Sequence, residues 1–282
     1  MMKKAVQQIM LGTVTKTEKQ ALDTLKQIKT AGFDGIELNG FMIKPTSFIV
    51  RTLTKAAGMP TGKGGNFDWV SLLKEADLKA VSIHEDLGSL ERDLTAIVNE
   101  AHLYNTDKVV ITGMYRFDYS DPDNVDNLCE RLNKAGKSLK SEGISLLYHN
   151  HNIEWLKCGD VTAYERIING TDSEYLNFEF DSYWPAEAGV DVLSVMKRLN
   201  SRLKLYHIND RGTKVYKTPI TPILKSDSME LGTGNMPLNE ILFLAKAQNV
   251  EAVILESHKN WIDKDPIKSI SVSGEYLSRT LI

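Results

Sequence analysis

The sequence predicts a protein of the α/β class, folded as a (β/α)8 TIM barrel with a single domain over residues 1–282. Short apolar runs alternate eight times with segments of helical periodicity, which indicates a parallel sheet, and eight such units indicate a closed barrel. The chain of 282 residues also fits a barrel, which needs about 250 residues. An open doubly wound sheet is disfavoured because no GxGxxG motif follows the first strand.

The predicted strands are the eight apolar runs. The first contains the sequence QIMLGTV, the second contains GIEL, and the fifth begins with the apolar residues Ile144, Leu146 and Leu147. In chain order the strands are expected at residues 8–14, 35–38, 78–84, 108–112, 143–149, 176–181, 203–208 and 252–256.

The segments between the strands predict helices. In residues 17–31, apolar side chains recur along one stripe and Gly32 closes the helix. Residues 121–142 begin with an Asp-Pro pair, which is typical of a helix start. The other helices are expected at 46–57, 67–75, 90–104, 161–168, 190–199, 237–248 and 269–281.

Two long connections stand out. Residues 58–65 form a glycine-rich loop, and residues 211–234 form the longest irregular segment, directly after the seventh strand. A long connection at this place suggests a lid or binding loop over one mouth of the barrel.

Composition narrows the class of protein. The formal net charge of −3 and pI of about 6.1 give no electrostatic reason to expect nucleic acid or an anionic membrane as a partner. Cys129 and Cys158 show no CxxC spacing, which fits a reducing compartment. No apolar run approaches the roughly 18 residues of a membrane span, and no signal peptide core is seen. We therefore expect a soluble, cytoplasmic protein.

The stretch SLLYHNHNIEW, residues 145–155, is the centre of the predicted site. Because a strand places residues i and i+2 on one face, His149 and His151 are expected to project together, followed by Asn152 and Glu154. Buried polar groups cost free energy unless they have partners. The two imidazoles either bond to the backbone or bind a metal, for which histidine is the commonest ligand.

Other histidines and acidic residues also lie at the C-terminal ends of predicted strands. The C-terminal ends of the predicted strands carry imidazoles and carboxylates, and this is the face where α/β barrels place their active sites. Nitrogen and oxygen donors without thiolates favour one catalytic divalent cation, with Mn²⁺ first and Zn²⁺, Co²⁺, Fe²⁺ or Mg²⁺ as alternatives. The residues are His84, His149, His151, His207 and His258, with Glu37, Glu85, Glu179, Asp181 and Glu256.

These residues lie in motifs that resemble the sugar phosphate isomerase/epimerase family, which shares a xylose isomerase-like barrel and includes ketose 3-epimerases, inosose dehydratase and, more distantly, endonuclease IV. The motifs are GFDGIEL (32–38), YHNHNIEW (148–155), FEFDSYWPAEAGVD (178–191), YHINDRG (206–212), ELGTGNMPLNEIL (230–242) and VILESHKNW (253–261).

The resemblance implies one divalent metal bound at the ends of strands five to eight. Its ligands would be His149, Asp181, His207 and Glu256. The chain departs from the family at two of its positions. His149 stands where the epimerases have Glu, and Asn209 stands where many relatives carry Lys. The first departure leaves the identity of the second acid/base residue open.

The chemistry that such a site supports is proton abstraction α to a carbonyl through a metal-bound cis-enediolate. Glu256 is expected to act as one base, with His149, His151 or Glu154 serving the opposite face. The expected substrate is a sugar or keto-sugar, with no nucleic acid and no membrane as partners, and a homo-oligomer is left open. The predicted substrate contacts are Glu37, His84, Asn152, Glu154, Trp184 and Arg211.

Other interpretations remain at this point. The same metal site serves a dehydratase or lyase of the inosose or 3-keto-glycoside type. An endonuclease IV-like repair enzyme would need more metal ligands and a basic surface, and a non-catalytic sugar-binding barrel would have lost its base. Individually, Asp181 could cap a helix, His207 could be a satisfied core histidine, and Glu256 could pair with Lys259 or Arg211.

Overall fold

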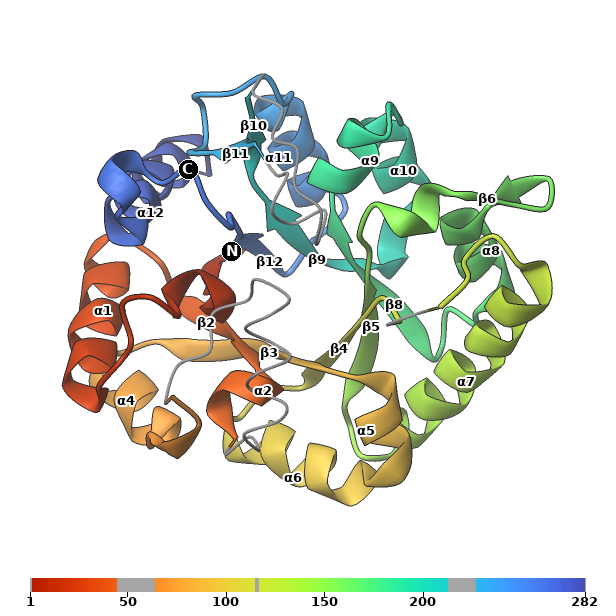
Figure 1. The fold of residues 1–282 in the computed structure, drawn as a ribbon, viewed down its shortest axis with the longest axis horizontal. Helices are drawn as coiled ribbons and strands as arrows, with labels where there is room; N and C mark the ends of the chain where they lie inside the picture. The colour runs from red at the N-terminus through yellow and green to blue at the C-terminus, as the bar shows by residue number, and fades with distance from the viewer. Residues whose placement is uncertain (1, 45–63, 115–116, 213–226, 282) are drawn as a thin grey trace. The chain divides into compact units, whose positions relative to one another are not determined.

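The structure is a computed structural model that describes residues 2–44, 64–114, 117–212 and 227–281 (Figure 1). The predicted helix at 46–57 and nearly all of the glycine-rich loop at 58–65 lie outside the described residues. Most of the irregular connection at 211–234 lies outside them as well.

Eight strands form a closed barrel, as the sequence predicts. Sequential neighbours lie side by side around most of the barrel, and the first strand meets the last. The order is β1 (Lys3–Gln7), β12 (Ala252–Leu255), β9 (Leu203–Ile208), β8 (Leu176–Asp181), β5 (Ser145–His149), β4 (Lys108–Thr112), β3 (Lys79–Glu85) and β2 (Gly35–Asn39).

By its internal contacts the chain divides into two compact units. The first unit consists of Met1–Val81, His207–Phe243 and Ala252–Ile282, and the second of Ser82–Tyr206 and Leu244–Glu251. That residues 1–282 form one domain stays a prediction.

In the first unit β1 is the central strand. It pairs in parallel with β12, where Val6 lies opposite Leu255, and with β2, where Gln7 lies opposite Glu37. The helical segments and short strands of this unit are η1 (Gln8–Leu11), α1 (Glu18–Thr30), α2 (Gly40–Ile43), η2 (Gly64–Asn66), α4 (Trp69–Glu75), β10 (Asp210–Arg211), β11 (Ser228–Met229), η6 (Ile262–Lys264) and α12 (Pro266–Thr280). Helix α11 (Leu238–Ala247) runs from this unit into the second.

The prediction of the first strand at 8–14 is wrong. The strand is β1, and the apolar residues that follow it form the 3-10 turn η1. The Gln7 side chain accepts a hydrogen bond from the Ile9 N–H at 2.6 Å, which caps this turn and ends the strand. The pattern was misleading because β1 contains two lysines and only two buried apolar residues, Ala5 and Val6.

The second unit contains the paired parallel strands β4, β5 and β8, and the last residues of β3 pair with β4. Thr112 lies opposite His149, and His149 lies opposite Glu179. The remaining elements are α5 (Leu87–Arg92), α6 (Leu94–Leu103), α7 (Pro122–Ser141), η3 (Ile153–Trp155), β6 (Lys157–Cys158), β7 (Val161–Thr162), α8 (Ala163–Gly170), α9 (Tyr183–Glu187), α10 (Val192–Leu199) and η4 (Asn200–Arg202).

The predicted helix at 90–104 is two helices, α5 and α6. Asp93 separates them because its backbone is not helical, with φ −149° and ψ 75°, and its side chain accepts the Ala96 N–H at 3.0 Å. Aspartate favours such a cap because its short carboxylate competes for nearby backbone donors. The helix predicted at 161–168 starts later, at Ala163, because Val161 and Thr162 form a short strand that pairs with β6. Helix α9 was not predicted from the sequence.

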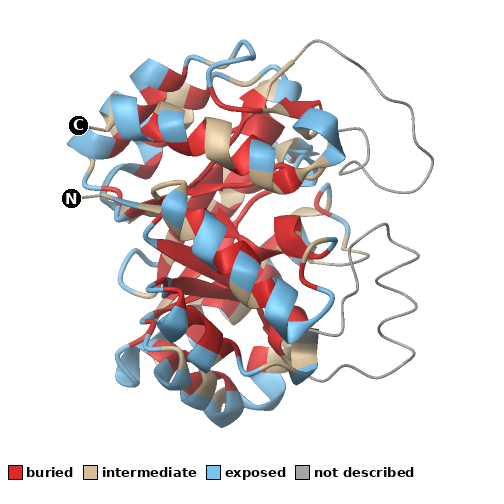
Figure 2. Cartoon of the chain, turned by 90° about the vertical axis from the view of Figure 1, so that its left-hand side faces the viewer, coloured by how far each residue is buried: buried red, intermediate tan, exposed pale blue. Residues whose placement is uncertain are grey.

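The longer helices that face the viewer in Figure 2 carry buried residues on one side and exposed residues on the other. In α1 the buried residues include Ala21, Leu25 and Ile28, as the 17–31 pattern predicts, and Thr17 caps the helix by accepting the Gln20 N–H. Most residues of the barrel strands are buried, so the core consists of these strands and the buried sides of the helices.

Helix α7 packs closely against the residue that precedes β8, and this contact can be tested by mutation. A Cβ at Gly136 would lie 2.1 Å from the Tyr175 carbonyl oxygen, so Gly136→Ala is expected to lower the free energy of unfolding by about 2–3 kcal/mol through overpacking. Gly143 has φ +74° and open space around it, so Gly143→Ala should cost only about 1 kcal/mol of backbone strain. Urea unfolding of both variants compares the two effects, and equal losses would contradict the steric argument.

Candidate metal centre and active site

The predicted ligands lie at the C-terminal ends of their strands. His149 ends β5, Asp181 ends β8, and Glu256 directly follows β12. His207 is the penultimate residue of β9. All four are buried, although each carries a polar or charged side chain. Such burial requires partners for every one of them.

In the first unit, His207 lies between two carboxylates. Its Nε2 atom is 2.5 Å from Glu37 Oε2, and its Nδ1 atom is 3.3 Å from Glu256 Oε2. Glu256 also lies 3.5 Å from His258 Nε2. Glu37 is completely buried in this contact, so the structure places this predicted substrate ligand against His207.

The electrostatics of Glu256 follow from these neighbours. Burial is the largest single influence and raises the pKa of Glu256, but the charges and hydrogen bonds of His258 and His207 together lower it by more. The net pKa lies well below the ordinary value.

The second unit has a similar arrangement around Glu179. Glu179 Oε2 lies 2.8 Å from His84 Nε2 and 3.1 Å from His149 Nδ1, and the two imidazole rings are 5.3 Å apart. Glu179 and His149 are directly opposite each other in the β5–β8 pair, which explains the contact. His84, predicted as a substrate contact, is therefore a partner of Glu179.

Asp181 is tied to the end of β5 by its backbone. The Asn150 amide donates to the Asp181 carbonyl at 2.9 Å and accepts the Asp181 N–H at 3.1 Å. The Asp181 Oδ1 atom accepts the Tyr183 N–H at 2.7 Å, at the start of α9. Asp181 therefore bonds to the first residue of α9, although the N-cap position of that helix is Ser182. Asp181 also belongs to a buried group of side chains that could hold a metal ion.

His151 follows His149 on the chain but lies outside the strand. Its ring is 4.9 Å from the His149 ring and 5.8 Å from the Trp184 ring. His151 is partly exposed, whereas Trp184 is only 4% exposed. The predicted proximity of the two histidines is confirmed, and Trp184 packs beside His151.

Glu154 is fully buried and accepts two hydrogen bonds. The Tyr148 hydroxyl donates to Oε1 at 3.0 Å, and the His151 backbone N–H donates to Oε2 at 2.9 Å. Burial disfavours the carboxylate and raises the pKa of Glu154 to about 7, although both hydrogen bonds act in the opposite direction. Asn152, predicted beside it as a substrate contact, is exposed.

This pKa makes the stability of the protein dependent on pH. Between the unfolded value of 4.5 and the folded value of about 7, the folded state holds a proton on Glu154 that the unfolded state has lost. The free energy of unfolding of the wild type, relative to Glu154→Gln, is therefore expected to fall by about 3 kcal/mol as the pH rises through this window. Urea unfolding of both proteins at pH 5, 6, 7 and 8 measures this difference in the free energy of unfolding. A difference that stays constant over these pH values would contradict the burial argument.

Arg211 begins the long connection after β9. Its Nε atom is 3.5 Å from the Asn235 side-chain oxygen, and the side chain is partly exposed. The neighbouring Asp210 carboxylate accepts four backbone N–H groups and so ties Arg211 to the described residues 232–236. The donors are Arg211, Gly232, Gly234 and Met236, at 2.8 to 3.0 Å.

These donors fit a divalent cation. A metal-binding histidine commonly contacts a carboxylate through its second nitrogen, as His207 contacts Glu37 and His149 contacts Glu179. With metal–ligand bonds of about 2.0–2.2 Å, neighbouring ligand atoms lie roughly 3 Å apart, close to the 3.3 Å between His207 and Glu256. The buried His, Glu and Asp side chains could therefore bind a metal ion.

Sequence reasoning left three residues of this site without a role. Glu179, His258 and Asn150 contact predicted ligands directly. The sequence already placed Glu179 and His258 among the polar residues at the strand ends, and Glu179 shares a strand face with Asp181, but neither was given a specific role. Asn150 carries no comparable signal, because its importance lies in a bond to the backbone of another strand.

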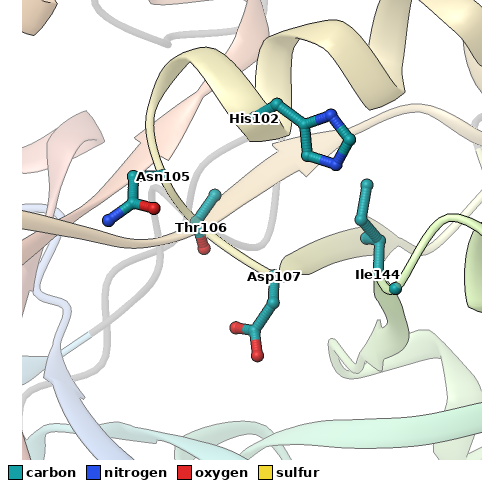
Figure 3. Close-up of a pocket in the computed structure, with 6 residues that line it drawn as sticks. His102, Asn105, Thr106, Asp107 and Ile144 are labelled. Carbon is teal, nitrogen blue, oxygen red and sulfur yellow. The ribbon is translucent and has the colours of Figure 1, made fainter.

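A surface hollow lies at the N-terminal ends of β4 and β5, away from the strand ends that carry His149 and Asp181 (Figure 3). It has a volume of about 590 Å³ and is lined by His102, Asn105, Thr106, Asp107, Gly143 and Ile144, which precede β4 and β5 or end α6. None of the predicted site residues lines it. His102 is exposed there.

Comparison with known proteins identifies related sequences. A model of the xylose isomerase-like TIM barrel family matches residues 25–272. An inosose dehydratase from Mesomycoplasma hyopneumoniae is 31% identical over 169 residues, which is 56% of this chain and 54% of that protein. The chain thus spans about half the length of the curated relatives it matches.

Solved structures share the fold. A sugar phosphate isomerase/epimerase from Parabacteroides distasonis is 19% identical with a TM-score of 0.77, covering 98% of this chain and 93% of that one. A xylose isomerase-like TIM barrel protein from Mycobacterium smegmatis, in complex with magnesium, is 14% identical with a TM-score of 0.69, covering 99% and 96%.

Proposed function

Because the chain belongs to the xylose isomerase-like TIM barrel family, we propose that it is a divalent-metal-dependent isomerase or epimerase of a sugar or sugar-like ketone. The observation that carries the proposal is the buried set of donors, His149, Asp181, His207 and Glu256, which could hold one metal ion. Their strands, β5, β8, β9 and β12, follow one another in the barrel, which supports a common site at the C-terminal ends.

A bound divalent cation would polarise the substrate carbonyl as a Lewis acid and so acidify the neighbouring C–H group. Mn²⁺ is the first candidate for this nitrogen and oxygen donor set, with Zn²⁺, Co²⁺, Fe²⁺ and Mg²⁺ as alternatives. Glu37 and Glu179 would hold His207 and His149 in the required orientation.

The chain's own side chains would move the proton. Glu256 is the proposed base, with its carboxylate oxygen accepting the proton from the carbon next to the carbonyl. His151 is the proposed second acid/base residue, because it is partly exposed and lies outside the proposed ligand set, whereas His149 is a proposed ligand. Arg211, which is half-buried, and Asn152, which is exposed, remain proposed substrate contacts.

A second candidate function is dehydration, as in an inosose dehydratase. It is favoured by the curated relatives, which carry that name. Its first step is the same abstraction by Glu256, after which a β-hydroxyl group leaves with a proton instead of the proton returning to carbon. The charge of −3 gives no support to a nucleic acid substrate.

One experiment separates the two candidates. The purified protein, supplied with Mn²⁺, is incubated in D₂O with a panel of ketoses and inososes, and the products are analysed by mass spectrometry and NMR. Deuterium at the carbon next to the carbonyl, with the carbonyl moved or the centre inverted, supports the isomerase or epimerase. Loss of one water supports the dehydratase. Absence of exchange, isomerisation and water loss with every substrate would overturn both.

The remaining expectations concern partners and location. The described helices include none that is long and apolar enough to cross a membrane. A sugar-type small molecule is the proposed partner. Cytoplasmic location and self-association stay predictions.

A further inference from the structure

A buried chain of hydrogen bonds runs through the second unit to the backbone of His151. The Met114 N–H donates to the Tyr119 hydroxyl at 2.8 Å, and the Tyr119 and Tyr148 hydroxyls are 2.9 Å apart. Tyr148 donates to one oxygen of Glu154, and the other oxygen accepts the His151 N–H. The chain joins the segment after β4 to the loop after β5.

This chain leaves no room for a substrate at Glu154. Tyr119 and Tyr148 are buried, and Glu154 is completely buried. A Cβ at Gly113 would lie 2.6 Å from Glu154 Oε1 and 3.1 Å from the Tyr119 hydroxyl, so the carboxylate packs directly against the backbone there. Glu154 is therefore a poor candidate for a sugar contact or for proton exchange with a substrate.

The backbone around His151 is held at two points. Asn150, on one side, is bonded to the backbone of Asp181, and the His151 N–H itself is bonded to Glu154. The His151 ring contacts the rings of both His149 and Trp184. The direction of the imidazole therefore depends on these backbone contacts.

We propose that Glu154 is a positioning residue, which fixes the His151 backbone and so aims the His151 imidazole for proton transfer without touching the substrate. The proposal rests on the proposed function, in which His151 is the second acid/base residue. A carboxylate suits the task because it accepts from a hydroxyl and an N–H at once. Catalysis is sensitive to such placement, since a shift of about 1 Å can cost a hundredfold in rate.

A glutamine at this position should preserve the contact. Its amide oxygen can accept the His151 N–H, and its NH₂ group can donate to the Tyr148 hydroxyl, which both donates and accepts. Glu154→Gln is therefore expected to keep kcat within about threefold of the wild type, whereas Glu154→Ala should lower kcat about tenfold or more with little change in KM. Equal losses in the two variants would overturn the proposal and make Glu154 an acid or base itself.

A double-mutant cycle tests whether Glu154 acts through His151. In a His151→Ala background, Glu154→Ala should cause no further loss of kcat, and a loss as large as in the wild type would overturn the proposal. Gly113→Ala displaces the Glu154 carboxylate without changing a titratable group. It should lower kcat when His151 is present and should have no effect on kcat in the His151→Ala variant. This variant keeps the test usable where Glu154→Ala fails to fold.

A spectroscopic measurement is independent of turnover. With selective ¹⁵N-histidine labelling the chain gives at most six backbone amide signals, and the His151→Ala variant assigns one of them. Glu154→Gln and Gly113→Ala should shift the His151 amide signal more than the His102 signal. An unmoved His151 signal would overturn the positioning role even where no substrate has been found. A moved signal without turnover on any ketose or inosose would instead count against the proposed function alone.

Discussion

Replacing Glu256 by Gln is expected to lower kcat about a thousandfold, because the amide can neither accept the substrate proton nor supply a charged metal ligand. The side chain keeps its shape, so the fold should be retained. Glu256 is 7% exposed and contacts both His207 and His258. The measurement is kcat and KM on the substrate found in the ketose and inosose panel.

Glu275→Gln is the matched control for this variant. Glu275 lies exposed on α12 of the same unit, so the identical chemical change there should leave kcat unaltered. Circular dichroism and thermal unfolding of both variants establish that they are folded. Activity of the Glu256→Gln variant close to that of the wild type would remove Glu256 from the mechanism.

Removing the metal is expected to abolish activity and to lower the thermal stability of the protein. A ligand that binds only the folded state at 100 times its Kd adds about 2.7 kcal/mol, which for a chain of this size corresponds to roughly 5 °C or more in Tm. The protein is stripped with a chelator, and Tm and turnover are measured after adding Mn²⁺, Zn²⁺, Co²⁺ or Mg²⁺ separately.

Two aspartate variants show whether the effect belongs to the proposed site. Asp181→Asn should lose the metal-dependent rise in Tm. Asp191→Asn is the control, since Asp191 also accepts the N–H two residues ahead but is exposed at the start of α10. It should keep the full metal-dependent rise. An equal rise in the wild type and both variants would place the metal elsewhere.

Local patterns were sufficient for most of the fold. The strands at 108–112, 176–181 and 203–208 have the predicted bounds, and Asp121 caps α7 as its Asp-Pro pair indicates. Strand periodicity and helix capping depend on neighbours in the sequence, so they can be recognised without the tertiary structure. The failures occurred where a local signal was ambiguous, as in β1 and at Asp93.

The same distinction holds for the site. The sequence by itself determined that imidazoles and carboxylates end the parallel strands, because the alternation of apolar runs and polar residues places them there. Only the tertiary structure decided their partners: Glu37 contacts His207, Glu179 contacts two histidines, and Glu154 is buried under the loop of His151. Contacts such as that between Glu37 and His207 join residues far apart in the chain. The physical reason is that strand register and packing, which set these distances, depend on the whole core and not on any one segment.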